Sequence, residues 1–175
     1  MNYFELFALP TTFEVNASEL KAKYLELQRT IHPDNFANAS ERERLMAVHK
    51  AAQINDAFDT LKSHDKRAEY LLSLAGIELA HETKTLRDPM FLMQQMELRE
   101  LLEDIPQASD PEQALSDFQQ QVEQAITQFK LNFSRQFAEN SADTLQQAAD
   151  DVRKLKFMLK LSKEAEALEE QIYTY

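Results

Sequence analysis

A single glycine in 175 residues constrains the fold of this chain more than any other feature of its sequence. Tight β-hairpin turns depend on residues that adopt positive φ, chiefly glycine, and the chain offers only Gly76 and five prolines as turn-forming residues of these two kinds. Apolar residues instead recur at spacings of three and four, which places them on one face of a helix. The sequence therefore predicts an all-α protein, long enough for one large domain or two small ones.

The first half of the chain predicts two long helices packed as an antiparallel pair. One spans residues 17–31 and begins with a capping box of Asn16 and Glu19; the next begins with a second box of Ser40 and Glu43. Pro33 ends the first helix because it disfavours helical geometry in the preceding residue. The apolar stripes of the two helices are Leu20, Tyr24, Leu27 and Ile31, and Ala47, Ala51, Ile54, Phe58 and Leu61.

Shorter helices are expected on both sides of this pair. Residues 3–9 are apolar and stop at Pro10, and residues 66–75 form a helix that closes at Gly76, a residue suited to a left-handed position after a helix end. The polar stretch that follows is the best domain boundary. The predicted organisation is a first domain at 1–76, a linker at 77–86 and a second domain at 87–175.

The second domain is predicted to be a three-helix bundle. Its helices cover about residues 89–104, 111–139 and 142–172, and the first two open with an aspartate cap followed by proline, at Asp88 and Asp110. The middle helix has the clearest apolar stripe: Leu115, Phe118, Val122, Ile126, Phe129, Phe133 and Phe137.

Composition excludes several functions. The net charge of −11, most of it in residues 85–175, disfavours binding to nucleic acid. The absence of cysteine rules out disulfides and thiolate metal sites, and the four histidines are too scattered for a histidine metal site. Apolar runs are too short for a signal peptide or a membrane span, so a cytoplasmic protein is expected.

The tripeptide His32-Pro33-Asp34 falls in the loop between the paired helices. One interpretation is structural: the proline stops a helix and the aspartate accepts hydrogen bonds from nearby backbone amides. The other is a contact point for a partner, which the local charge favours. Basic residues outnumber acidic ones in residues 17–32, and they are Lys21, Lys23 and Arg29.

Two further segments accompany the tripeptide, residues 54–61 (INDAFDTL) and residues 66–70 (KRAEY). Together they make the first 75 residues resemble a J domain, the module through which co-chaperones engage seventy-kilodalton heat-shock ATPases. The resemblance implies that His32, Pro33 and Asp34 contact the ATPase, and that the helix bearing the three basic residues meets an acidic surface. Asn35 departs from the family, which often has lysine there.

The helix that begins near Pro89 has two different apolar faces. Phe91, Leu98, Leu102 and Ile105 form the expected core stripe. Three more large apolar residues fall on the opposite side, among acids, so either another helix covers them or they mark a contact surface. These residues are Leu92, Met93 and Met96, and the acids include Glu97, Glu100, Glu103 and Asp104.

Phe157 presents the same choice on the last helix. It lies away from the predicted stripe, so it is either a second contact residue or packs against a neighbouring helix. The stripe consists of Leu145, Ala148, Val152, Leu155 and Leu159.

A closer resemblance covers nearly the whole chain. Its motifs are Tyr3-Phe4, His32-Pro33-Asp34, residues 67–74 (RAEYLLSL), 91–93 (FLM), 97–100 (ELRE) and 152–155 (VRKL). They resemble the HscB family of iron–sulfur co-chaperones. In that family the C-terminal bundle binds the scaffold on which iron–sulfur clusters are assembled, and the J domain delivers it to a dedicated heat-shock ATPase.

The HscB resemblance implies an IscU-like scaffold and an HscA-like ATPase as partners. The implied scaffold-binding residues are Leu92, Met93, Met96, Glu97, Glu100, Asp104 and Phe157, with Asp104 a shorter form of the family's acid. The cysteine-bearing N-terminal module of some relatives is not expected in this protein. The expected protein is a monomeric adaptor without catalytic activity, cofactor or metal.

Two alternatives to this interpretation stay open. The first is a J-domain protein that serves another folding client. The second belongs to a different class, a structural helical protein that oligomerises through the Leu92–Met96 surface.

Overall fold

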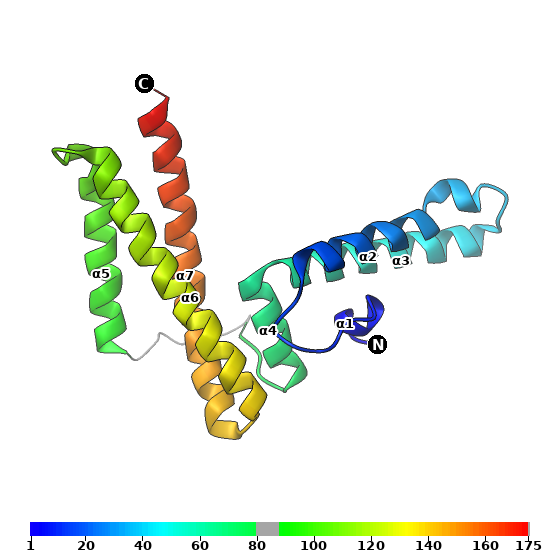
Figure 1. Cartoon of the computed structure of the whole chain (residues 1–175). Helices are drawn as coiled ribbons and strands as arrows, with labels where there is room; N and C mark the ends of the chain where they lie inside the picture. The colour runs from blue at the N-terminus through cyan, green and yellow to red at the C-terminus, as the bar shows by residue number, and fades with distance from the viewer. Residues whose placement is uncertain (80–87, 175) are drawn as a thin grey trace. The chain divides into compact units, whose positions relative to one another are not determined.

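The computed structural model describes residues 1–79 and 88–174, and every regular element in these ranges is a helix. The predicted all-α fold is therefore confirmed. The chain divides into two compact units, Met1–Ile77 and Glu78–Tyr175 (Figure 1). Most of the predicted linker, residues 77–86, falls outside the described residues, so the predicted domain limits stay predictions.

The first unit is built around an antiparallel pair of helices, α2 and α3, with the 3-10 helix η1 in the connection between them (Figure 1). Helices α1 and α4 both contact α3. The elements are α1 (Tyr3–Leu6), α2 (Ala17–Thr30), η1 (Pro33–Phe36), α3 (Glu41–Lys62) and α4 (His64–Leu74).

The two predicted helix starts are capped as expected, but in simpler form. Asn16 Oδ1 accepts a hydrogen bond from the Glu19 amide at 3.0 Å, and Ser40 Oγ accepts one from the Glu43 amide at 3.2 Å. The return bond from the glutamate side chain is not among the hydrogen bonds of the described residues at either start. Each cap therefore satisfies one of the free amides at its helix end rather than two groups reciprocally.

The α2 stripe is buried at one end only. Leu20 is fully buried, whereas Tyr24, Leu27 and Ile31 are half-buried. In Figure 1 the part of the α2–α3 pair next to η1 extends beyond α1 and α4. The stacked rings of Tyr24 and Phe58, 4.0 Å apart, join the two helices farther from η1. The end of the hairpin that carries η1 thus projects from the core of its unit.

Gly76 closes α4 as predicted. Its φ is +90°, and the backbone forms the two hydrogen bonds of a Schellman motif, Ile77 N to Leu72 O at 2.8 Å and Gly76 N to Ser73 O at 3.0 Å. The chain's single glycine therefore occupies the position just after α4, where a positive φ would strain most other residues.

The second unit contains the three predicted helices with nearly the predicted bounds. Asp88 and Asp110 cap α5 and α6 by accepting hydrogen bonds from the Phe91 and Gln113 amides. In residues 1–79 and 88–174 no helix has the length and apolarity needed to span a bilayer. The elements are α5 (Pro89–Asp104), η2 (Ile105–Gln107), α6 (Pro111–Glu139) and α7 (Ala142–Tyr173).

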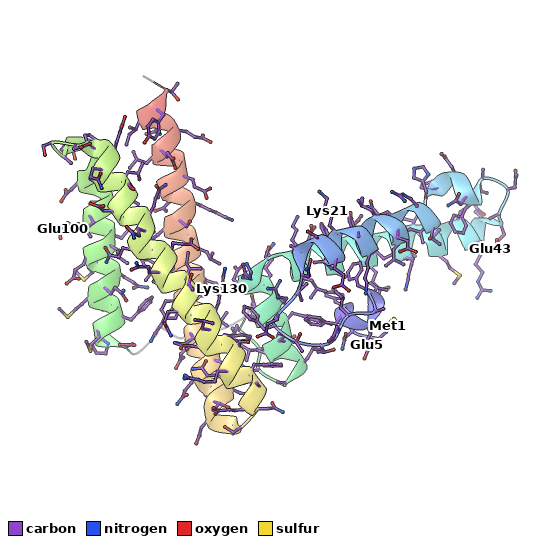
Figure 2. All side chains as sticks on the ribbon, in the orientation of Figure 1. Met1, Glu5, Lys21, Glu43, Glu100 and Lys130 are labelled. Carbon is purple, nitrogen blue, oxygen red and sulfur yellow. The ribbon has the colours of Figure 1, made fainter. Side chains whose placement is uncertain are left out.

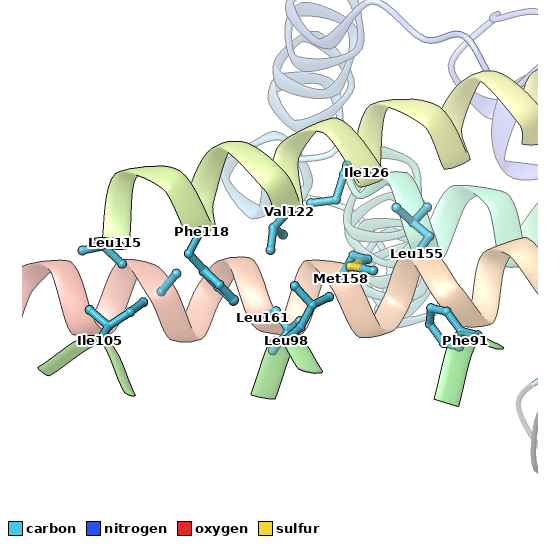
Figure 3. Packing of buried hydrophobic residues seen from close by; sticks show 11 residues of the cluster. Phe91, Leu98, Ile105, Leu115, Phe118, Val122, Ile126, Leu155, Met158 and Leu161 are labelled. Atoms are coloured by element: carbon cyan, nitrogen blue, oxygen red, sulfur yellow. The ribbon is translucent and has the colours of Figure 1, made fainter. Parts of the chain in front are cut away.

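The core of this unit lies where α5, α6 and α7 meet (Figure 3). Phe91 and Leu98 of α5 and Ile105 of η2 point into it, as predicted. On α7 the predicted residue Leu159 packs against the core but is only partly buried, and Met158, which the prediction did not include, is fully buried. Leu155, Met158 and Leu161 follow one another at intervals of three residues and are all fully buried. Leu159, one residue after Met158, is therefore rotated partly away from the core.

Two polar side chains, Arg67 and Gln136, are buried among the residues that the structure describes. Arg67 donates to the Leu61 carbonyl at 2.6 Å and to His64 Nδ1 at 2.9 Å, and burial lowers the pKa of its guanidinium. Gln136 donates through Nε2 to Asp151 at 3.0 Å, while its Oε1 has no partner among the described residues. Burial raises the pKa of the Asp151 carboxyl.

Candidate functional site

The His32-Pro33-Asp34 loop forms where α2 has to stop. Pro33 is the first residue of η1, and His32 before it adopts an extended ψ of 138°, as expected for a residue that precedes proline. The Asp34 amide donates to His32 Nδ1 at 3.2 Å. These local constraints fix a compact turn in place of further helix.

The Asp34 carboxylate faces solvent. Its side chain is 90% exposed and lies 3.5 Å from His32 Nδ1, so the structural interpretation of the tripeptide, in which this carboxylate binds backbone amides, receives no support from the described contacts. An exposed carboxylate on a fixed turn is suited to pairing with a basic group on another molecule. A depression of about 300 Å³ adjoins the loop and is lined partly by Leu25, Arg29 and Pro33.

The three predicted basic residues of α2 are not equivalent. Lys21 and Arg29 are exposed, and Figure 2 shows Lys21 on the outer side of α2. Lys23 is already engaged, because its ammonium lies 3.3 Å from the Glu19 carboxylate and donates to the Ala8 carbonyl at 3.1 Å. Lys21 and Arg29 are therefore the two that are available to a partner.

The second site is an apolar surface on α5, made of Leu92, Met93 and Met96 and called here the α5 patch. These side chains are 55%, 62% and 66% exposed, so no helix of the described residues covers them. Met90, one turn before Met93 and 81% exposed, extends the patch. Sequence reasoning missed Met90, although its spacing of three from Met93 was available.

Acidic side chains follow the α5 patch along the same helix. Glu97, Glu100 and Asp104 are all exposed, and at spacings of four, seven and eleven from Met93 they continue its face. Figure 2 shows Glu100 on the side of α5 away from α6 and α7. The surface is therefore apolar toward the start of α5 and negatively charged toward its end.

Two ion pairs hold α5 against α7. Lys154 donates to Asp88 at 2.8 Å, and Arg99 pairs with Glu164. The hydrogen bond from Lys154 is the largest of the effects that lower the pKa of the Asp88 carboxyl. Because Asp88 also caps α5, this one side chain ties the start of the patch-bearing helix to its neighbour.

Phe157 packs between these ion pairs rather than standing free. Its ring meets Phe91 edge-on at 5.8 Å, and the Arg99 guanidinium lies 5.7 Å from its centroid, so the ring is half-buried. Of the two sequence interpretations, the packing against a neighbouring helix is the one observed. Arg99 lies two turns after Leu92 on the same face of α5, so the Phe157 ring contacts a residue on the face that carries Leu92.

Within residues 1–79 and 88–174, His, Asp and Glu side chains form no cluster of three or more arranged to hold a metal ion. The two exposed surfaces, a carboxylate loop and an apolar patch bordered by acids, are suited instead to contacts between macromolecules.

Models of two known domain families match the two units of the chain. A family model described as the DnaJ domain matches residues 2–70, and one described as the HSCB C-terminal oligomerisation domain matches residues 87–166. The co-chaperone protein HscB homolog of Photobacterium profundum is 57% identical over 173 residues, 99% of each chain. The chain belongs to the HscB family of co-chaperones.

Solved structures of HscB proteins have the same fold. The chaperone HscB from Vibrio cholerae matches with a TM-score of 0.89 at 51% identity, over 98% of this chain and 99% of that one. Human co-chaperone HscB matches with a TM-score of 0.86 at 28% identity, over 97% and 82%. The HscB architecture of a J domain followed by a C-terminal helical domain is thereby confirmed for this chain.

Proposed function

We propose that this chain is a bridging adaptor in iron–sulfur cluster assembly. Its J domain contacts an HscA-like heat-shock ATPase and stimulates ATP hydrolysis, while the α5 patch binds an IscU-like cluster-assembly scaffold and delivers it to that ATPase. The observation that carries the proposal is the presence of two chemically different exposed surfaces on two separate compact units.

The ATPase arm of the proposal depends on charge. Asp34 offers a carboxylate to a basic group of the ATPase, and Lys21 and Arg29 face an acidic surface on it. Charge complementarity of this kind accelerates association and weakens as salt increases. Stimulation of hydrolysis further requires that the ATPase bind the loop with different affinity in its nucleotide states.

The scaffold arm depends on apolar area. Three adjacent large side chains of the α5 patch supply an apolar centre, and the carboxylates beyond it supply a polar rim. The complementary surface on the scaffold is therefore apolar at its centre and basic at its edge. The proposed scaffold-binding residues are Leu92, Met93, Met96, Glu97, Glu100, Asp104 and Phe157.

The adaptor catalyses no reaction and carries no cofactor in this proposal. Its effect comes from holding scaffold and ATPase on one chain, which raises the effective concentration of the scaffold at the ATPase. The proposed compartment is the cytoplasm, and the proposed working form is a monomer.

The deciding experiment measures ATP turnover by the ATPase with this protein, with the scaffold and with both. The proposal expects a greater than additive rate when both are present. A rate equal to the sum of the separate effects would contradict the coupling of the two arms. A pulldown from the same reagents separates this function from a J-domain protein for another client, because only the proposed adaptor retains the scaffold.

Self-association through the α5 patch is a second candidate function. It is favoured by the description of the matching family model, which names an oligomerisation domain, and by the exposure of the patch. Sedimentation of the purified chain over a range of concentrations tests it. A dimer that dissociates when Leu92, Met93 and Met96 are changed to alanine would support self-association over the monomeric adaptor.

A further inference from the structure

The C-terminus of α2 leaves backbone carbonyls that need donors. The last four carbonyls of an α-helix have no partner within the helix and carry the negative end of its dipole. In α2 the Ile31 amide donates to the Leu27 carbonyl at 3.2 Å. The carbonyls of Arg29 and Thr30, the last two residues of α2, are bonded by a residue beyond the loop.

That residue is Asn35. Its side-chain Nδ2 donates to the Arg29 carbonyl at 2.7 Å and to the Thr30 carbonyl at 3.1 Å, and its backbone amide donates to the His32 carbonyl at 2.9 Å. One residue therefore spans the tripeptide, with the end of α2 on one side and η1 on the other. Both hydrogens of a single amide group are used.

We infer that Asn35 is a positioning residue for the ATPase contact. Its amide locks the His32–Asp34 loop onto the end of α2, so the Asp34 carboxylate is held in place before the partner arrives. The inference rests on the proposed function, since it adds a residue to the same site. A loop that is already ordered loses less conformational entropy on binding, which raises affinity.

Chemistry explains why an amide serves at this position. Asparagine supplies two donors without a charge, whereas aspartate has the same shape but only acceptor oxygens at neutral pH. A carboxylate there would face two carbonyls at the negative end of the helix. Replacing Asn35 by aspartate therefore removes both bonds and adds repulsion with almost no change in volume.

The test measures stimulation of the ATPase by the full-length chain as its concentration is varied. For Asn35→Asp we expect the half-maximal concentration to rise at least tenfold, while maximal stimulation at saturation stays within twofold of wild type. Asn35→Ala removes the same hydrogen bonds without adding repulsion, and it should raise the half-maximal concentration about three- to tenfold. Asn35→Gln keeps both donors and should recover at least half of the loss.

The matched control is Asn38→Asp. Asn38 is exposed in the same loop, so this change adds the same charge without touching the α2 carbonyls, and we expect less than a twofold effect. Backbone hydrogen exchange checks the cause: the Asp34 and Asn35 amides should exchange faster in Asn35→Asp, while buried α3 amides such as that of Ile54 stay protected.

Each outcome decides the inference. Wild-type behaviour of Asn35→Asp and Asn35→Ala, or an Asn38→Asp effect as large as that of Asn35→Asp, would overturn it. If Asn35→Asp unfolds α3, the result for Asn35→Ala decides in its place. Asp34→Asn separates this inference from the proposed function: full stimulation by Asp34→Asn refutes the proposed function, whereas its loss together with a normal Asn35→Ala refutes only the role of Asn35.

Discussion

The His32–Asp34 loop and the α5 patch are both exposed and suited to contacts with a partner, but different interactions hold them in place. The loop is held by individual hydrogen bonds at the end of a helix that projects from its core. The α5 patch lies on a helix whose other face packs into an apolar core through Phe91 and Leu98. The first surface therefore depends on the geometry of a few polar atoms, and the second on the area of several apolar side chains.

This difference predicts different responses to mutation. A site made of directed polar contacts should fail when one atom changes, because the partner group is left unpaired. A site made of apolar area should lose affinity in steps as side chains are truncated. The experiments that follow test this contrast.

The largest effect is expected from Asp34→Asn. The change removes one charge from an exposed side chain, so folding should be unaffected, but an unpaired basic group is left on the ATPase. We expect ATPase stimulation to fall more than tenfold, with scaffold binding unchanged. ATP turnover and a scaffold-binding titration measure the two.

Asp56→Asn is the control for this prediction. Asp56 is exposed on α3, so the same chemical change away from the loop should leave stimulation intact. Equal losses in Asp34→Asn and Asp56→Asn would show that net charge, rather than the loop, controls stimulation.

A smaller but still large effect is expected when Leu92, Met93 and Met96 are all changed to alanine. Removal of three exposed apolar side chains should weaken scaffold binding by about 2 kcal/mol or more, in steps for the single changes. Basal ATPase stimulation should stay normal. Calorimetric titration with the scaffold gives the affinity, and circular dichroism verifies that helicity is retained.

Leu131→Ala provides the matched control, because Leu131 is 62% exposed on α6 of the same unit. Unaltered scaffold binding by the triple variant would place the scaffold elsewhere. Complete loss from a single truncation would contradict the contrast between the two surfaces.

A moderate effect is expected when the acids beyond the patch are neutralised. Glu97→Gln, Glu100→Gln and Asp104→Asn together should slow association with the scaffold several-fold at low salt and flatten the salt dependence of the rate. Stopped-flow measurement at several ionic strengths tests this. A salt dependence as steep as that of wild type would assign the electrostatic attraction to other residues.

The smallest effect is expected from Asp151→Asn, which touches neither surface. Because burial raises the native pKa of Asp151, the folded state holds its proton more tightly than the unfolded state. The free energy of unfolding therefore falls as the pH rises from the ordinary aspartate pKa of about 3.9 through the raised pKa of Asp151 in the folded state. Asparagine removes the buried charge and keeps an oxygen for Gln136 Nε2, so it should stabilise α6–α7 by roughly 0.5–1 kcal/mol at neutral pH.

Hydrogen exchange of α6–α7 amides at pH 5 and pH 8 measures this change, with Glu166→Gln as an exposed control on α7. Stimulation and scaffold binding should both stay normal. A loss of protection in Asp151→Asn would mean that the carboxylate makes a stabilising contact that outweighs its burial.

Local signals in the sequence predicted much of the fold. Gly76 marked the end of α4 because few other residues tolerate its φ, and Asp88 and Asp110 marked helix starts because a carboxylate before proline caps a helix. The α5 patch was visible as well, since Leu92 and Met93 break the pattern of a helix with one apolar face.

Features that depend on contacts between distant residues were not predictable in the same way. The engagement of Lys23 requires the Ala8 carbonyl, and the partial burial of Phe157 requires Phe91 and Arg99 from another helix. Helical periodicity allows a step of three or four, so spacing alone does not decide between Met158 and Leu159. The role of Asn35 depends on the turn at Pro33, which brings its amide back to α2.

The division of the chain into two compact units, each with its own surface, has a consequence for mixtures of variants. A chain with Asp34→Asn would still occupy the scaffold through α5 but would not activate the ATPase. Present beside the wild-type chain, it would act as a competitor that sequesters the scaffold, and its inhibition would increase with its share of the total. A chain whose α5 patch side chains are truncated would also inhibit the wild-type chain, because it would occupy the ATPase without bringing the scaffold.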